Sequence, residues 1–128
     1  MAIANKLTRI MPAFGNATEY ITLLAQNLPA GATTVFTLTG FTNYVRSGRW
    51  RIKSTVAGTG AITSITVTAT DGTTTVQLKP VGDAVPASTL FDYLYSFISD
   101  LNLNSFSFSI INGAGTASTL DFELTGNP

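Results

Sequence analysis

Residues 64–78 read SITVTATDGTTTVQL, and this stretch is the strongest indication of fold in the chain. Its apolar residues alternate with threonine up to Asp71-Gly72, and a second β-rich run follows. A period of two places apolar side chains on one face of a strand. Asp-Gly between two such runs is the strongest short-range signal of a hairpin with a type I′ turn. We therefore predict antiparallel strands at about residues 61–70 and 73–79.

Similar alternation occurs in both directions from this hairpin. Residues 105–110 and 119–124 alternate between apolar and polar side chains on either side of a glycine-rich turn, which predicts a second hairpin. Residues 49–56 alternate as well, and residues 35–39 form a short β-rich run. Residues 19–26 favour a strand because Tyr, Ile and Thr are enriched in strands. Each strand is expected to bury one face and leave the other in water.

Residues 88–101, STLFDYLYSFISDL, depart from this pattern. Their apolar residues recur at helical spacing: Leu90, Leu94, Phe97, Ile98 and Leu101. Thr89 with Asp92 resembles a capping box in which Asp replaces the usual Glu. We predict one helix here, packed on the sheet as the crossover between the two hairpins.

The expected architecture is all-β, a β-sandwich or jelly-roll-like fold with antiparallel hairpins and one short helix at about 88–101. The length of 128 residues predicts a single domain over residues 1–128. Residues 1–17 are expected to form either an extended arm or an edge strand. No run approaches the apolar length of a membrane span, and the first ten residues do not have the order of a signal peptide.

The chain has no histidine and no cysteine. This composition removes the usual general base, the thiolate nucleophile and nearly every zinc site. Asp121 and Glu123 would share one face of a strand, about 7 Å apart, but on a polar face where nothing raises a carboxyl pKa. We predict that the protein is not an enzyme and has no catalytic, cofactor-binding or metal-binding residues. No cofactor is expected.

A cluster of basic residues is the remaining candidate for a site. Four of the seven basic residues lie within eight residues of sequence: Arg46, Arg49, Arg51 and Lys53. Alternation places the last three on one face and Trp50 on the other. They are our candidate partner-contact residues, and two interpretations stay open. The cluster either contacts an acidic partner or is a solvated face, paired across strands with Asp121 and Glu123.

In style the chain resembles the capsid decoration, or cement, proteins of tailed bacteriophages. The resemblance is carried by a small chain without His or Cys that is rich in Thr, Gly and Ala, by the run SITVTATDGTTTVQL, and by an arm-like N-terminal stretch, MAIANKLTRIMPAFGNATEY. It implies a non-enzymatic virion structural protein on the capsid exterior. Such a protein would form a homotrimer, bind the major capsid protein or other virion subunits, and stabilise the shell.

The alternative is a carbohydrate- or receptor-binding β-sandwich module, of the fibre-tip or lectin-like kind. Exposed Trp and Tyr would favour sugar binding, whereas burial of Trp50 and a large apolar interface would favour the virion subunit. Low charge with 45% hydrophobic residues predicts a homo-oligomer, with a trimer as the first choice. Nucleic acid is not an expected partner, because the net charge is zero and the basic cluster lacks a stacking aromatic. A membrane is not expected either, because no run has the apolar length of a span.

Overall fold

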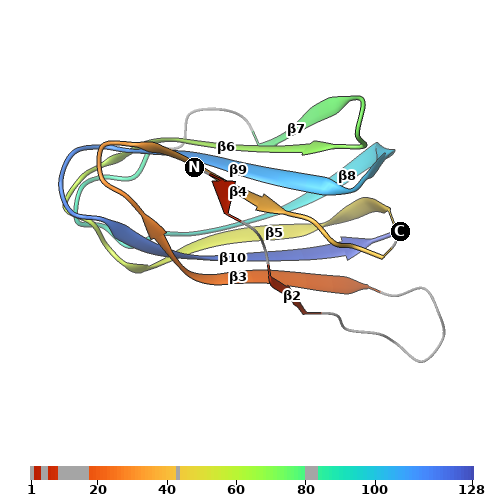
Figure 1. Ribbon diagram of the computed structural model, residues 1–128, viewed down its shortest axis with the longest axis horizontal. Helices are drawn as coiled ribbons and strands as arrows, with labels where there is room; N and C mark the ends of the chain where they lie inside the picture. The colour runs from red at the N-terminus through yellow and green to blue at the C-terminus, as the bar shows by residue number, and fades with distance from the viewer. Residues whose placement is uncertain (1, 4–5, 9–17, 43, 80–83) are drawn as a thin grey trace.

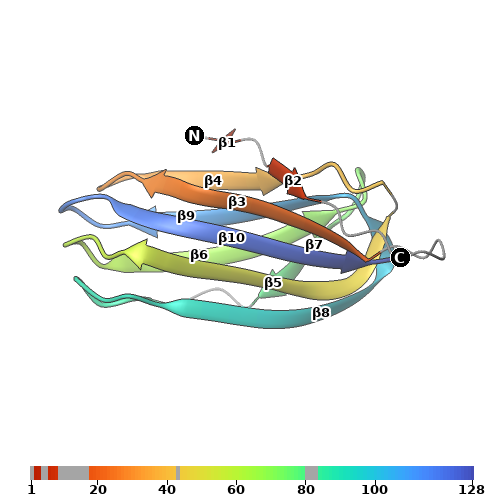
Figure 2. The same cartoon turned by 90° about the horizontal axis from the view of Figure 1, so that it is seen from below.

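Two β-sheets face each other in the computed structural model, which describes residues 2–3, 6–8, 18–42, 44–79 and 84–128 (Figures 1 and 2). Sheet A contains, in spatial order, β1 (Ala2–Ile3), β4 (Thr33–Leu38), β9 (Ser105–Asn112), β6 (Ile62–Thr70) and β7 (Thr75–Lys79). Sheet B contains β2 (Lys6–Thr8), β3 (Glu19–Leu28), β10 (Ser118–Asn127), β5 (Val45–Val56) and β8 (Asp92–Leu103). Neighbouring strands are antiparallel except β1 and β4. The predicted all-β sandwich is confirmed.

Aromatic side chains fill the space between the sheets. The rings of Phe36 on β4 and Phe122 on β10 lie 4.5 Å apart between centroids. Phe108 on β9 lies 5.3 Å from Phe122 and 6.0 Å from Trp50 on β5. All four side chains are fully buried. The inward positions of both sheets therefore form one core, and polar residues are left to the outer faces.

The predicted hairpin around Asp71-Gly72 is confirmed as β6 and β7, but its turn is not type I′. The Asp71 carboxylate accepts hydrogen bonds from the backbone N–H groups of Thr73 (2.9 Å) and Thr74 (2.7 Å). Gly72 has a φ of 100°, whereas Asp71 is not among the described residues with positive φ. A type I′ turn needs positive φ at both central residues. Here the Asp71 side chain caps a longer loop instead.

The predicted second hairpin is wrong, although both of its strands exist. β9 pairs with β4 and β6 in sheet A, whereas β10 pairs with β3 and β5 in sheet B. Residues 113–117 therefore connect the two sheets rather than two neighbouring strands. Alternation shows which face of a strand is buried, but both strands bury the same kind of face. It cannot identify the partner of either strand.

The predicted helix at 88–101 is also wrong, because Asp92–Leu103 forms strand β8 at the edge of sheet B. Phe97 is buried, whereas other residues of the expected helical face are not: Ile98 is 86% exposed and Leu94 is 54% exposed. Phe97 and Leu103 belong to the core, and Tyr93 and Leu101 pack against it beside β5. Thr89 does not cap a helix, and its hydroxyl bonds to the Ala87 carbonyl. Across the described residues, no helix is long and apolar enough to cross a membrane.

The N-terminal segment supplies the strand at one edge of each sheet. β1 lies beside β4 and β2 lies beside β3 (Figure 2). The rest of the expected arm or edge strand, residues 1, 4–5 and 9–17, lies outside the described residues.

Candidate functional site

The outer face of sheet B carries most of the predicted partner-contact residues. Along β5, Trp50 is fully buried, whereas Arg49 and Lys53 are exposed on the outside with the half-buried Arg51 between them. Alternation in the sequence predicts this division, and the structure confirms it. Arg46, the fourth predicted residue, is also exposed, and it lies at the register irregularity between Val45 and Ser47 of β5.

Arg46 contacts the edge strand. Its Nε donates a hydrogen bond of 2.8 Å to the side-chain oxygen of Asn102 on β8. It lines neither of the hollows described below.

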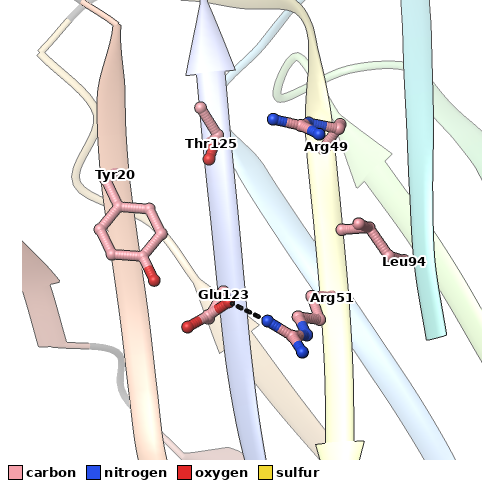
Figure 3. Close-up of a pocket in the computed structure, with 6 residues that line it drawn as sticks. All are labelled: Tyr20, Arg49, Arg51, Leu94, Glu123 and Thr125. Carbon is pink, nitrogen blue, oxygen red and sulfur yellow. Dashed lines mark ion pairs between the residues drawn. The ribbon is translucent and has the colours of Figure 1, made fainter. Parts of the chain in front are cut away.

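Arg51 holds two carboxylates on this face. Its Nε donates to Asp92 Oδ1 at 2.8 Å, and Nη2 donates to Oδ2 of the same side chain. Its Nη1 lies 3.5 Å from Glu123 Oε2 on β10 (Figure 3). The hydrogen bond from Arg51 lowers the pKa of Asp92. The predicted pairing with Glu123 is confirmed, whereas the sequence pattern places Asp92 on a helix.

Tyr20 on β3 completes this cluster. Its hydroxyl points towards Glu123 in Figure 3. Partial burial, the hydrogen bond to Glu123 and the charge of that carboxylate together raise the pKa of Tyr20 to about 12. The phenol therefore stays neutral at physiological pH and donates a hydrogen bond to the carboxylate. Side chains on the outside of the sheet thus tie neighbouring strands together.

Lys53 and Asp121 are opposite each other in the sheet without forming an ion pair. Asp121 Oδ1 instead accepts a hydrogen bond of 2.8 Å from the backbone N–H of Ala25. Ala25 has a positive φ of 55°, and it lies where the register of β3 and β10 shifts. Asp121 therefore bonds to the backbone of a β-bulge in β3 and not, as predicted from the sequence, to a basic residue of β5.

Two adjoining hollows cross this face. The first has a volume of about 180 Å³ and is lined by Tyr20, Arg49, Arg51, Leu94, Glu123 and Thr125 (Figure 3). The second has a volume of about 500 Å³ and is lined by Thr18, Ser47, Gly48, Arg49, Ser96, Phe97, Ile98, Thr125 and Asn127. Arg49 and Thr125 line both, and they are opposite each other in the sheet. We call the two hollows together the sheet B groove.

Gly48 allows the close strand approach beneath the second hollow. An added Cβ there would lie 1.8 Å from the backbone oxygen of Thr125, closer than any real contact. Its opposite residue on β10 is also a glycine, Gly126. Ser47 and Ser96 add only short side chains to the lining. Small residues therefore surround the place where Arg49 and Ile98 project.

A separate hollow of about 380 Å³ is lined by Phe41, Thr42, Tyr44 and Asn104. Tyr44 is 57% exposed. The backbone N–H of Thr42 donates to the buried Glu19 carboxylate at 2.7 Å, which anchors this loop to β3. The hollow shares no lining residue with the sheet B groove.

Sequence reasoning missed three residues of the first hollow. Thr125 continues the alternation of β10, and the alternation of β3 places Tyr20 outside between the buried Glu19 and Ile21, so both could be found by extending those patterns. Leu94 is the third, because the helical spacing of 88–101 predicts it in the core. The part of the chain described here contains no group of three or more acidic residues able to hold a metal ion.

Comparisons with known proteins add similarities of structure alone. No protein-family model matches the sequence, and no curated protein matches it significantly. A solved structure of the Clostridium thermocellum xylanase 10B, comprising its CBM22-1 and GH10 modules with xylohexaose, is similar with a TM-score of 0.46 and 14% identity. The match covers 96% of this chain and 24% of that chain. A structure described as "CBM4 structure and function" is similar with a TM-score of 0.36 and 10% identity, over 97% of this chain and 78% of that chain. We draw no function from these two similarities.

Proposed function

We propose that this chain is a non-catalytic β-sandwich module that binds a carbohydrate in the sheet B groove. The observation that supports this proposal is the composition of the groove. Hydrogen-bonding side chains lie next to apolar ones along a single open face: Arg49, Glu123, Thr125, Ser47, Ser96 and Asn127 beside Tyr20, Leu94 and Ile98. A sugar ring presents the same combination, with hydroxyl groups around its edge and apolar C–H groups on its faces.

The donors and acceptors of the groove are complementary to hydroxyl groups. Arginine supplies only donors, a carboxylate supplies only acceptors, and serine, threonine and asparagine supply both. Each sugar hydroxyl is both donor and acceptor, so it can bond to every member of this set. Because Arg51 and Tyr20 already hold Glu123, part of the site is organised before a ligand arrives, which lowers the entropic cost of binding.

The aromatic contribution comes from tyrosine in this proposal. Trp50 cannot stack on a ligand, because it is fully buried between the sheets. Tyr20 lies in the wall of the first hollow (Figure 3). Its ring offers apolar surface while its hydroxyl remains bonded to Glu123.

The test is binding of the full chain to soluble polysaccharides, with a variant that fills the groove. Ser96→Tyr places a large side chain in the second hollow, and the affinity for any bound glycan should fall about tenfold or more, the equivalent of about 1.4 kcal/mol. Ser107→Tyr is the matched control, since Ser107 lies on β9 in the other sheet. Native affinity electrophoresis against dextran, mannan, polygalacturonate and dextran sulfate gives the readout. No retardation by any glycan of a broad panel would contradict the proposal.

A second candidate is a virion structural subunit, the capsid decoration protein that the sequence resembles. Burial of Trp50 and exposure of Leu94 and Ile98 on an edge strand favour it. These are the features expected of a chain that covers apolar surface by assembling. The mass of the purified protein in solution, together with the identity of what co-purifies with it, separates the two candidates. A capsid exterior location and a capsid partner remain part of this second proposal.

A further inference from the structure

The charges on the outer face of sheet B are unevenly distributed along the strands. Lys53 is opposite two acidic residues, Asp121 on β10 and Asp92 on β8. One row further along, Arg51 is held by Asp92 and Glu123. Three acidic side chains therefore gather at one end of this face, whereas Asp100 is exposed further along β8.

Arg49 lies in the next row and has no such partner. Its neighbours across the sheet are Thr125 on β10 and Ser96 on β8, and Thr125 is in turn opposite Tyr20 on β3. None of these three carries a charge at neutral pH. The guanidinium of Arg49 forms no hydrogen bond or ion pair with the residues that the structure describes. The nearby carboxylate of Glu19 is buried on the inner side and bonds to Thr42.

Arg49 also lies at the centre of the groove. It lines both hollows, and in Figure 3 its guanidinium lies beside Thr125, away from the cluster around Arg51. A ligand that occupied either hollow would meet this side chain. Arg49 is exposed and has only hydroxyl-bearing residues opposite it in the sheet, and Arg51 already holds the Glu123 carboxylate that lines the same hollow. Arg49 therefore presents a positive site to that ligand.

We infer that the ligand of the sheet B groove is an anionic polysaccharide, and that Arg49 binds its charged group. The inference rests on the proposed carbohydrate-binding function and narrows its ligand class. Guanidinium groups bind carboxylates and sulfates through paired N–H donors in a planar fork. A uronic acid carboxylate and a sulfate ester both fit this chemistry, and the hydroxyls of Thr125 and Ser96 can bond to the sugar hydroxyls beside it.

Three soluble polymers test the inference on the full chain: polygalacturonate for the carboxylate, dextran sulfate for the sulfate, and dextran as the neutral reference. At moderate salt we expect at least one anionic polymer to bind about tenfold more tightly than dextran, as one charge-assisted interaction provides. Arg49→Gln should remove that preference, and Arg49→Lys should restore part of it. Whichever anionic polymer shows the Arg49-dependent preference identifies the charged group.

Lys53→Gln is the control, because Lys53 is an exposed cation on the same strand and face but lines neither hollow. It should leave binding within about twofold of the wild type. Equal losses in Arg49→Gln and Lys53→Gln would overturn the inference in favour of general charge attraction. Tight binding of dextran that Arg49→Gln does not change would overturn it while the proposed function stands. Binding of an acidic protein or an oligonucleotide without any glycan would overturn both.

Discussion

Arg51 on β5 binds Asp92 on β8 diagonally, although Lys53 is the residue opposite Asp92 in the sheet. The planar guanidinium forms two parallel hydrogen bonds with the carboxylate, a geometry that a lysine ammonium cannot match. Leu94 is the residue opposite Arg51, and its side chain lines the groove. The ion pair therefore joins the edge strand to the centre of the sheet and shapes the first hollow.

The first prediction concerns the pH dependence of this pair. The pKa of Asp92 is lowered in the folded protein, mainly by the hydrogen bond from Arg51. Because the pKa is lower in the folded protein, the ion pair stabilises the fold fully at pH values above the pKa of Asp in the unfolded chain, which is about 3.9. The contribution is lost as the pH falls through the folded pKa. Asp92→Asn should therefore lower the urea midpoint slightly at pH 7, and its difference from the wild type should shrink as the pH falls from about 3.9 through the folded pKa.

Asp100→Asn is the matched control for that experiment, since Asp100 is an acid on the same strand without a hydrogen bond or ion pair among the described residues. It should leave the urea midpoint unchanged at neutral pH. A loss in Asp92→Asn that persisted undiminished in acid would show that the carboxylate does not act through its charge.

The second prediction tests the strand at Asp92–Leu103. Phe97 is buried and its ring lies 5.6 Å from that of Phe106, so Phe97→Ala should cost about 3–5 kcal/mol in free energy of unfolding. Leu94 projects into the groove wall, so Leu94→Ala should cost less than about 0.5 kcal/mol. Urea denaturation measures both. Similar large losses at the two positions would instead indicate the helix that their spacing suggests.

The third prediction concerns the close approach of β5 and β10. A methyl group at Gly48 would collide with the Thr125 backbone oxygen, and backbone atoms cannot rotate away. Gly48→Ala should lower the free energy of unfolding by about 1–3 kcal/mol, as overpacking does. Ser47→Ala, in the adjacent position of the same hollow, should change it by no more than about 0.5 kcal/mol. If Gly48→Ala were as stable as the wild type, the distance between β5 and β10 at this position would have to be larger than in the structure.

The fourth prediction concerns self-association, expected as a homotrimer. β8 forms one edge of sheet B, and an edge strand presents unpaired backbone groups to other chains. Ile98 is 86% exposed there, so a lysine at this position should oppose association. Sedimentation velocity at micromolar concentration should show an oligomer for the wild type and a smaller species for Ile98→Lys. Ile111→Lys on β9 of sheet A is the control and should behave as the wild type does. A wild-type monomer at every concentration would refute association.

The alternation of side chains is sufficient to predict much of this fold. A strand that packs against a second sheet must bury every other residue, so the period of two in 61–70, 105–110 and 119–124 identifies both the strand and its buried face. The same reasoning predicts Trp50 inside and Arg49 outside, and both lie where it places them. Local geometry alone determines this relation, because successive side chains in a strand point to opposite faces.

The tertiary structure decided what alternation leaves open. In residues 88–101 the apolar residues satisfy both a helical and a strand period, and only the need to cover the core beside β5 selects the strand. The sheet assignments of β9 and β10 likewise depend on partners far away in the sequence. The groove forms only when Tyr20, Arg49, Leu94 and Thr125 meet across four neighbouring strands. No local sequence pattern predicts that these four residues lie together. Their placement depends on the register between strands, and register is set by the long-range packing of the whole sandwich.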